Sequence, residues 1–244
     1  MKIPPADMAY IAQRFHELAD RLDASLDDRA AAESSGTTPA NARDAMRRLA
    51  ILLQDPNSGD NPGGSERELQ TLGDFGIHLI EELADLATAA ELHEVADEIR
   101  LLSFPLAVWI GRQGAEITQL GPVVNAAAFL ANQVRDPIAM AELYTCLCLV
   151  IEAVAPRLTG AEADNDPANP WRLLLLNRAI VATRSHRAEL MEPALDAVVE
   201  LLPETAARFL EEGMDQMAQI PYPEHVREIM RRYYLAHASQ RTLH

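Results

Sequence analysis

The sequence predicts an all-α protein, and three observations support this prediction. Ala and Leu dominate the composition, and runs of β-branched residues are scarce, which favours helices over strands. Apolar residues recur in alternating steps of three and four along most of the chain, the period of a helix with one buried face. The 15 prolines and 11 glycines are spread along the chain, as expected for helices joined by short turns.

The first 54 residues are expected to form a helical hairpin. Its first helix begins near residue 6 and carries an apolar stripe made of Met8, Ile11, Phe15, Leu18 and Leu22. The second helix is expected over 39–54. Residues 55–65 are predicted to form a flexible loop, because residues 55–64 consist only of the turn-forming residues Asp, Asn, Ser, Pro and Gly.

Residues 66–244 are predicted to be helical, with one further loop at 159–169. Ser65 and Glu68 form a capping-box pattern at the start. Several prolines suit first helical turns, among them Pro105, Pro122, Pro137, Pro170 and Pro203. Gly73 and Gly76 are expected to let another backbone approach closely. The predicted helices cover residues 66–86, 89–103, 105–112, 121–135, 136–156, 170–184, 190–202, 203–219 and 222 onward, which makes about eleven in all.

From residue 66 onward the predicted helices fall into successive antiparallel pairs about 30–40 residues apart. This spacing resembles that of tetratricopeptide- and HEAT-like helical-repeat proteins. The resemblance implies an α-solenoid that binds other proteins. The specific tetratricopeptide residue pattern does not occur cleanly in any unit, so an irregular helical bundle is the alternative. Residues 1–54 form either a separate hairpin or part of one domain with 66–244.

Charge excludes some classes of partner. The chain has a net charge of −16, and residues 66–169 alone carry 5 basic and 17 acidic side chains. A phosphate backbone or an anionic membrane surface would be repelled by this segment. We therefore expect neither a nucleic acid nor a membrane as partner.

The cysteines and the hydropathy pattern predict a cytoplasmic protein. Cys146 and Cys148 lie two positions apart in a predicted helix, so their side chains point roughly 200° apart and do not bridge. Residues 1–10 lack the apolar core of a signal peptide. No apolar run approaches the roughly 20 residues that a membrane helix needs.

No motif fixes a reaction, a metal or a cofactor. The sequence lacks a nucleophile elbow, a zinc-protease helix motif and a phosphate-binding loop. His78 with Glu82 and His93 with Asp97 each lie one helical turn apart, a spacing that suits metal ligands but also surface ion pairs. Because no further ligands accompany them, we expect no metal and no cofactor.

The candidate site is a set of polar residues within apolar helices. Asn125 and Asn132 lie seven positions apart and share a face, and Asn177 and Arg184 repeat that spacing, with Arg178 beside them. In a groove, Asn would bond the backbone of a bound peptide and Arg would pair with its carboxylates. The alternative is structural: each Asn ties down a neighbouring loop, and Arg184 caps a helix C-terminus.

These observations favour a non-catalytic adaptor or scaffold that binds a protein or peptide. Two other functions stay open. One is a helical bundle that binds a small ligand or acts as an enzyme, with a polar pocket near Asn177 and Arg178. The other is a structural subunit that associates with itself, for example as a homodimer.

The charge distribution gives a first prediction. Binding of the purified chain to duplex DNA or single-stranded RNA should be undetectable at physiological salt in a gel-shift or anisotropy titration, because the net charge of −16 repels phosphate. A salt-sensitive complex at submicromolar concentration would contradict the charge argument. It would direct attention to Arg227, Arg231 and Arg232 in the last predicted helix.

Overall fold

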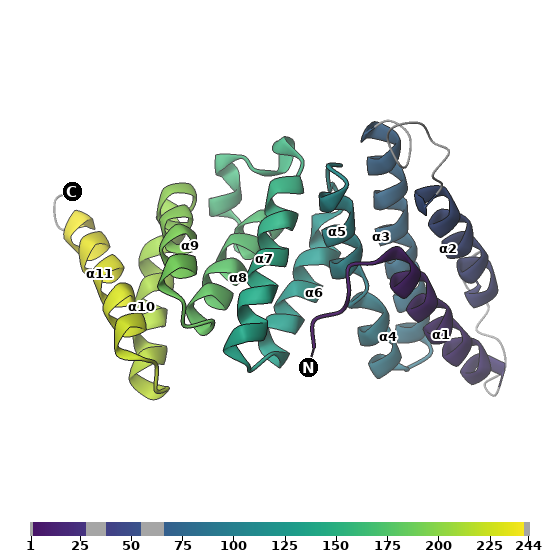
Figure 1. Cartoon of the computed structure of the whole chain (residues 1–244), viewed down its shortest axis with the longest axis horizontal. Helices are drawn as coiled ribbons and strands as arrows, with labels where there is room; N and C mark the ends of the chain where they lie inside the picture. The colour runs from purple at the N-terminus through teal and green to yellow at the C-terminus, as the bar shows by residue number, and fades with distance from the viewer. Residues whose placement is uncertain (1, 28–37, 55–65, 242–244) are drawn as a thin grey trace. The chain divides into compact units, whose positions relative to one another are not determined.

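The computed structural model of the chain describes residues 2–27, 38–54 and 66–241 (Figure 1). Within these residues it contains eleven α-helices and two short 3-10 helices. The described part has no strand, and its one β-bridge is an isolated pair, Ile117 with Val154. The all-α prediction is therefore confirmed. The predicted loop at 55–65 lies outside the described residues.

Contacts between residues divide the chain into two compact units. The first unit comprises residues 4–129 and 152–155, and the second comprises residues 1–3, 130–151 and 156–244. The boundary falls within α6 (Leu120–Gln133) and near the end of α7 (Pro137–Ala153). This grouping places residues 4–54 with the helices that follow them. The division predicted at residues 55–65 stays a prediction, as does the solenoid arrangement.

The first unit is built from helices that bury one apolar stripe each. It contains α1 (Met8–Asp27), α2 (Pro39–Gln54), α3 (Glu66–Ala89), α4 (His93–Arg100), α5 (Ser103–Arg112) and most of α6. The stripe predicted for the first helix, from Met8 to Leu22, is buried at all five positions. The closest helix neighbours are α1 with α2 and α3 with α4.

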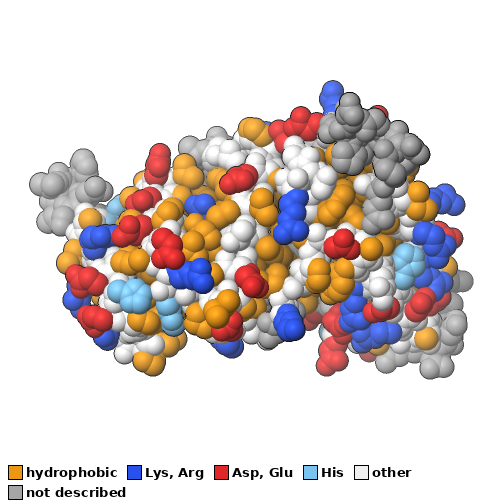
Figure 2. Space-filling model, in the orientation of Figure 1, with side chains coloured by type: hydrophobic (Ala, Val, Ile, Leu, Met, Phe, Trp, Pro, Cys, Tyr) orange, Lys and Arg blue, Asp and Glu red, His pale blue; other side chains and the backbone are white. Residues whose placement is uncertain are grey.

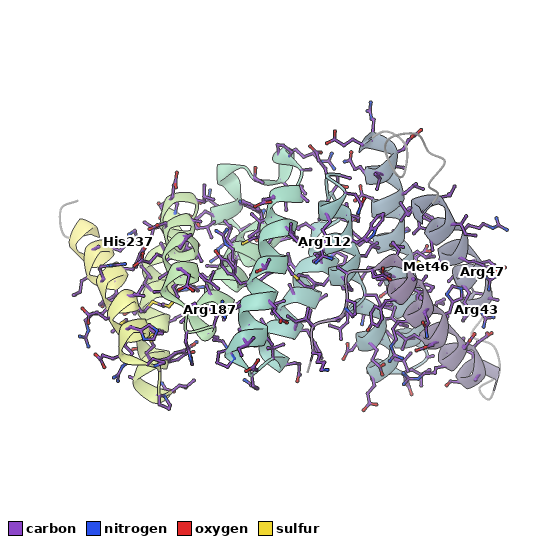
Figure 3. All side chains as sticks on the ribbon, viewed as in Figure 1. Arg43, Met46, Arg47, Arg112, Arg187 and His237 are labelled. Atoms are coloured by element: carbon purple, nitrogen blue, oxygen red, sulfur yellow. The ribbon has the colours of Figure 1, made fainter. Side chains whose placement is uncertain are left out.

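Ion pairs on the surface of this unit join helices that are distant in sequence. Arg14 and Arg21 of α1 both contact the carboxylate of Glu98 on α4. Arg43 of α2, labelled in Figure 3, contacts Asp20 and Asp23 of α1. These side chains are partly exposed, so each pair stabilises the unit by well under about 1 kcal/mol, and the buried stripes dominate.

The second unit contains α7 up to residue 151 and four further helices. These are α8 (Pro170–Arg184), α9 (Ala188–Leu201), α10 (Pro203–Gln219) and α11 (Glu224–Arg241), which pack chiefly as α8 with α9 and α10 with α11. Asn169 caps α8 as predicted, since its Oδ1 accepts the N–H of Trp171 at 2.9 Å. The starts of α8 and α10 lie 33 positions apart, within the predicted pair spacing.

The segment predicted as a loop at 159–169 contains a short 3-10 helix, η2 (Ala161–Asn165), anchored by Asp164. Leu202, at the N-cap of α10, has no side-chain acceptor, and Asp164 takes that role by accepting the Glu204 N–H at 2.7 Å. The same carboxylate accepts the Thr205 hydroxyl at 2.5 Å. Thr205 in turn accepts the Nε–H of Arg172 on α8 at 2.8 Å. This buried network joins η2 and the first turns of α8 and α10.

The start predicted for the helix over 89–103 is wrong. The sequence predicts a helix over 89–103, but α3 runs on to Ala89 and α4 covers only His93–Arg100. The reason is a Schellman turn: Leu92 N–H bonds Ala87 O, Glu91 N–H bonds Thr88 O, and Glu91 has φ 60°. Sequence reasoning missed it because the left-handed position holds Glu where Gly is usual.

The two glycines of α3 make room for side chains of other helices. A Cβ on Gly73 would lie 2.6 Å from Cδ1 of Ile110 on α5. A Cβ on Gly76 would lie 2.8 Å from Leu49 of α2 and 2.9 Å from Leu106 of α5. The nearest atoms thus belong to side chains, in place of the close backbone approach that the sequence suggested.

The contacts of Gly76 give a second prediction. Gly76→Val should lower the melting temperature by about 2–10 °C, because overpacking a core costs roughly 1–3 kcal/mol and a protein of this size loses about 2–4 °C per kcal/mol. Gly121→Val is the matched control, since nothing lies within 4 Å of a Cβ there. Differential scanning calorimetry should show the control near wild type. Equal melting temperatures for the two variants would contradict the packing described for Gly76.

Candidate functional site

The predicted site residues on α6 are both exposed. Asn125 belongs to the first unit and Asn132 to the second. Phe129, between them on the same face, is 37% exposed. Neither amide is buried, so neither needs an internal hydrogen-bond partner. Their role in binding a partner stays a prediction.

The predicted residues on α8 are half-buried. Asn177 and Arg178 both keep part of their surface in solvent, but the Arg178 Nε is buried without a hydrogen-bond partner. Arg178 lies near Tyr144 of α7, whose pKa is raised by burial and by the adjacent Cys148. The charge of Arg178 acts in the opposite direction on that pKa. Neither Cys146 nor Cys148 forms a disulfide, as the sequence predicts.

Arg184 caps a helix C-terminus, but the helix is α6 and not its own. Its Nη1 donates to the carbonyl of Ala131, and its Nη2 donates to the carbonyl of Val134 at 2.8 Å. These carbonyls have no partner within the helix, and a cation also interacts favourably with that end of the helix dipole. Arg184 therefore has the structural role that the sequence analysis gave as the alternative, which is capping a helix C-terminus. Burial lowers the pKa of Arg184.

Arg184 also lines a pocket that lies within the second unit, between α8, α10 and the start of α11. The pocket has a volume of about 170 Å³. Its apolar walls are formed by Leu176 and Ile180 of α8, by Phe209 and Met217 of α10, and by Met230 of α11. Ile180 is 39% exposed, whereas both methionines are buried.

Helices α8 and α10 run in the same direction past this pocket. The hydrogen bond from Arg172 to Thr205 joins their first turns, and their later turns, 176–184 and 209–217, both line the pocket. Gly213 faces Met230, with 3.1 Å between the Met230 Sδ and the position that a Cβ would take. The missing side chain lets the thioether lie against α10. Thioethers are flexible and polarizable, which suits a surface that adapts to its ligand.

Polar groups stand around the apolar walls. They include Arg184, Glu212, Gln216 and Tyr222. Glu212 already pairs with Arg208 at 3.3 Å, and both of these side chains are largely exposed. Among the residues that the structure describes, no carboxylate forms an ion pair with Arg184. The two charged groups at the pocket therefore differ, because only the acidic one has a counter-ion.

A histidine side chain adjoins Tyr222, which lines the pocket. The ring of His186 lies 5.6 Å from that of Tyr222, edge to face, and His225 Nε2 lies 2.8 Å from the carbonyl of His186. Burial lowers the pKa of His186, and the nearby His225 lowers it further. Arg187, labelled in Figure 3, follows at the N-cap of α9 and is exposed.

The volume of the pocket limits what it can hold. Pockets for drug-sized ligands and cofactors typically measure about 300–1,000 Å³. A cavity of about 150 Å³ lined by apolar side chains accommodates a single benzene ring. At about 170 Å³, this pocket fits one apolar side chain such as Leu, Met or Phe.

Of the five predicted site residues, only Arg184 lines this pocket. Sequence reasoning missed Phe209, Met217 and Tyr222. Phe209 and Met217 share a face of α10 with other apolar residues, so periodicity alone assigns them to a core. Tyr222 precedes α11 in a Pro-rich turn, and its place beside α8 depends on tertiary packing that no local pattern reports.

Two negative observations apply to the described residues. They contain no group of three or more His, Cys, Asp or Glu side chains arranged to hold a metal ion. His78 and Glu82 do approach each other, at 3.5 Å, as an exposed pair. In the same part of the chain, no helix is both long enough and apolar enough to span a membrane.

Comparison of the chain with protein-family models, with curated proteins and with solved structures finds no match.

Arg184 and Asn177 of α8 give a third prediction. Arg184→Met keeps the length of the side chain but removes both bonds to the end of α6, so it should lower the melting temperature by about 2–10 °C. Asn177→Ala should change it by less than about 2 °C, because Asn177 is partly exposed. Thermal denaturation followed by circular dichroism measures both. A large loss for Asn177→Ala would instead make this amide structural.

Proposed function

We propose that the chain is a non-catalytic binding protein that takes one apolar side chain of a partner protein into the pocket between α8, α10 and α11. The observation that carries this proposal is a pocket with apolar walls, a polar rim and the volume of a single side chain. Interfaces between proteins are commonly anchored in this way, by a few buried side chains surrounded by polar contacts.

The proposal favours a peptide segment over a small molecule. A metabolite or cofactor would need more volume than about 170 Å³ and several convergent polar groups. The rim offers an amide, a phenol and two charged groups, which can contact the backbone and neighbouring side chains of a bound segment. Asn177, one and two turns from Ile180 and Arg184 on the same stripe of α8, would extend these contacts along the helix.

We also propose that the protein works in the cytoplasm as an adaptor or scaffold. Two cysteines that form no disulfide support a reducing compartment. The acidic net charge supports a protein partner over nucleic acid or an anionic membrane. Hydrophobic side chains that reach the surface among charged ones, as on the face in Figure 2, offer further contact area for a partner.

The fourth prediction tests the pocket. A library of displayed random peptides selected against the immobilised full chain should yield sequences that share one apolar residue at a fixed position. Synthetic versions should bind Ile180→Asp at least about 10-fold more weakly than wild type in fluorescence anisotropy, because an anchor residue typically carries 2 kcal/mol or more. Ile180 is 39% exposed, so the variant should still fold.

Ile138→Asp is the matched control. Ile138 is 63% exposed, lies in the first turn of α7 where an acidic residue is tolerated, and does not line the pocket. It should bind the peptides as wild type does. If no peptides are enriched, or if the enriched peptides bind Ile180→Asp as tightly as Ile138→Asp, the pocket is not the binding site.

A further inference from the structure

The charge around the pocket is asymmetric, and this asymmetry bears on which segment the pocket binds. At one side, Glu212 of α10 is neutralised by Arg208 at 3.3 Å. At the other side stands Arg184, half-buried and bonded to neutral carbonyl groups. Within the described part of the chain, neither Arg184 nor Arg135 forms an ion pair with a carboxylate. Arg135 directly follows Val134, whose carbonyl accepts the Arg184 bond, and its positive charge acts on the pKa of Arg184.

Arg135 and Arg184 both lack a carboxylate partner among the described residues, although the protein is acidic. The chain carries 37 acidic and 21 basic side chains, so counter-ions are plentiful on average. Like charges close together repel, and placing one of them in a half-buried position adds a desolvation cost. An anionic group of a ligand would relieve both effects. We refer to Arg184, which lines the pocket, together with Arg135, which follows its bonding partner Val134, as the cationic rim.

Arg184 retains donors for such a group. A guanidinium carries five N–H donors, and the bonds to Ala131 and Val134 use two of them, so three remain. The Tyr222 side chain lines the same end of the pocket and can add a hydroxyl donor.

We infer that the pocket binds a peptide segment of a partner protein in which an Asp or Glu side chain neighbours the apolar anchor. The anchor fills the apolar walls, and the carboxylate lies at the cationic rim, where it pairs with Arg184 and Arg135. This inference rests on the proposed function, because it specifies the partner for the same pocket. A carboxylate suits the site better than a long polyanion, since the net charge of −16 repels an extended run of phosphates.

The fifth prediction uses three defined peptide pools. Each pool has one central Leu, Met or Phe, and its flanking positions carry Asp or Glu in the first pool, Lys or Arg in the second, and Ser or Gly in the third. Anisotropy titrations against the full chain should show the acidic pool binding most tightly. Raising the salt concentration from 50 to 500 mM should narrow its advantage, since exposed charge pairs are screened.

Charge-reversal variants test whether the cationic rim causes the tighter binding of the acidic pool. Arg135 is exposed, so Arg135→Glu should fold normally and weaken the acidic pool by about 3- to 10-fold, the range for reversing one charge at the edge of an interface. Arg231→Glu is the matched control, because Arg231 is an exposed residue of α11 in the same unit and neither lines the pocket nor adjoins a bonding partner of Arg184. It makes the same change in net charge and should leave binding within about 2-fold.

The outcomes separate this inference from the proposed function. If the basic or neutral pool binds as tightly as the acidic pool and Ile180→Asp abolishes that binding, the inference is overturned while the pocket keeps its function. Equal effects of Arg135→Glu and Arg231→Glu also overturn it. If no pool depends on Ile180, both proposals fail together.

Discussion

The backbone groups at helix ends set the constraint on which the rest of this structure depends. An all-α chain leaves amide groups at one end of each helix and carbonyl groups at the other end without internal partners. Here several of them are satisfied by side chains far away in sequence. Asp74 of α3 accepts the N–H groups of Thr118 and Gln119 just before α6, at 3.1 and 3.3 Å. Arg184 of α8 bonds the other end of α6.

The pocket follows from two of these connections within the second unit. Asp164 satisfies the first turn of α10 and, through Thr205, holds the buried Arg172 of α8. The first turns of α8 and α10 are thereby fixed to each other by a network too polar to leave unpaired in a core. Further along the same two helices no such network is needed, because apolar side chains form the walls of the pocket there. Met230 of α11 completes these walls.

Local sequence patterns predicted the helices well, but they could not predict contacts between segments that lie far apart in the sequence. Asn169 followed by Pro170 identifies a helix start because the cap and the proline act within one turn. Asp164 cannot be recognised in the same way, since the helix that it caps begins at Pro203. For the site, helical periodicity placed Asn177 and Arg184 on one stripe of α8. It could not show that α10 and Tyr222 lie opposite that stripe, because this depends on packing between segments distant in sequence.

The capping bonds of Arg184 also bear on the energetics of binding. An arginine that is free in solution loses rotamer entropy when a ligand immobilises it, a cost of about 0.5–1.5 kcal/mol for a side chain of this kind. The bonds to Ala131 and Val134 already hold this guanidinium in place. Its remaining donors therefore stand at the edge of an apolar pocket before any partner arrives. Stability and recognition are then not competing roles for Arg184, because the bonds that close the end of α6 orient the charge that a partner carboxylate would meet.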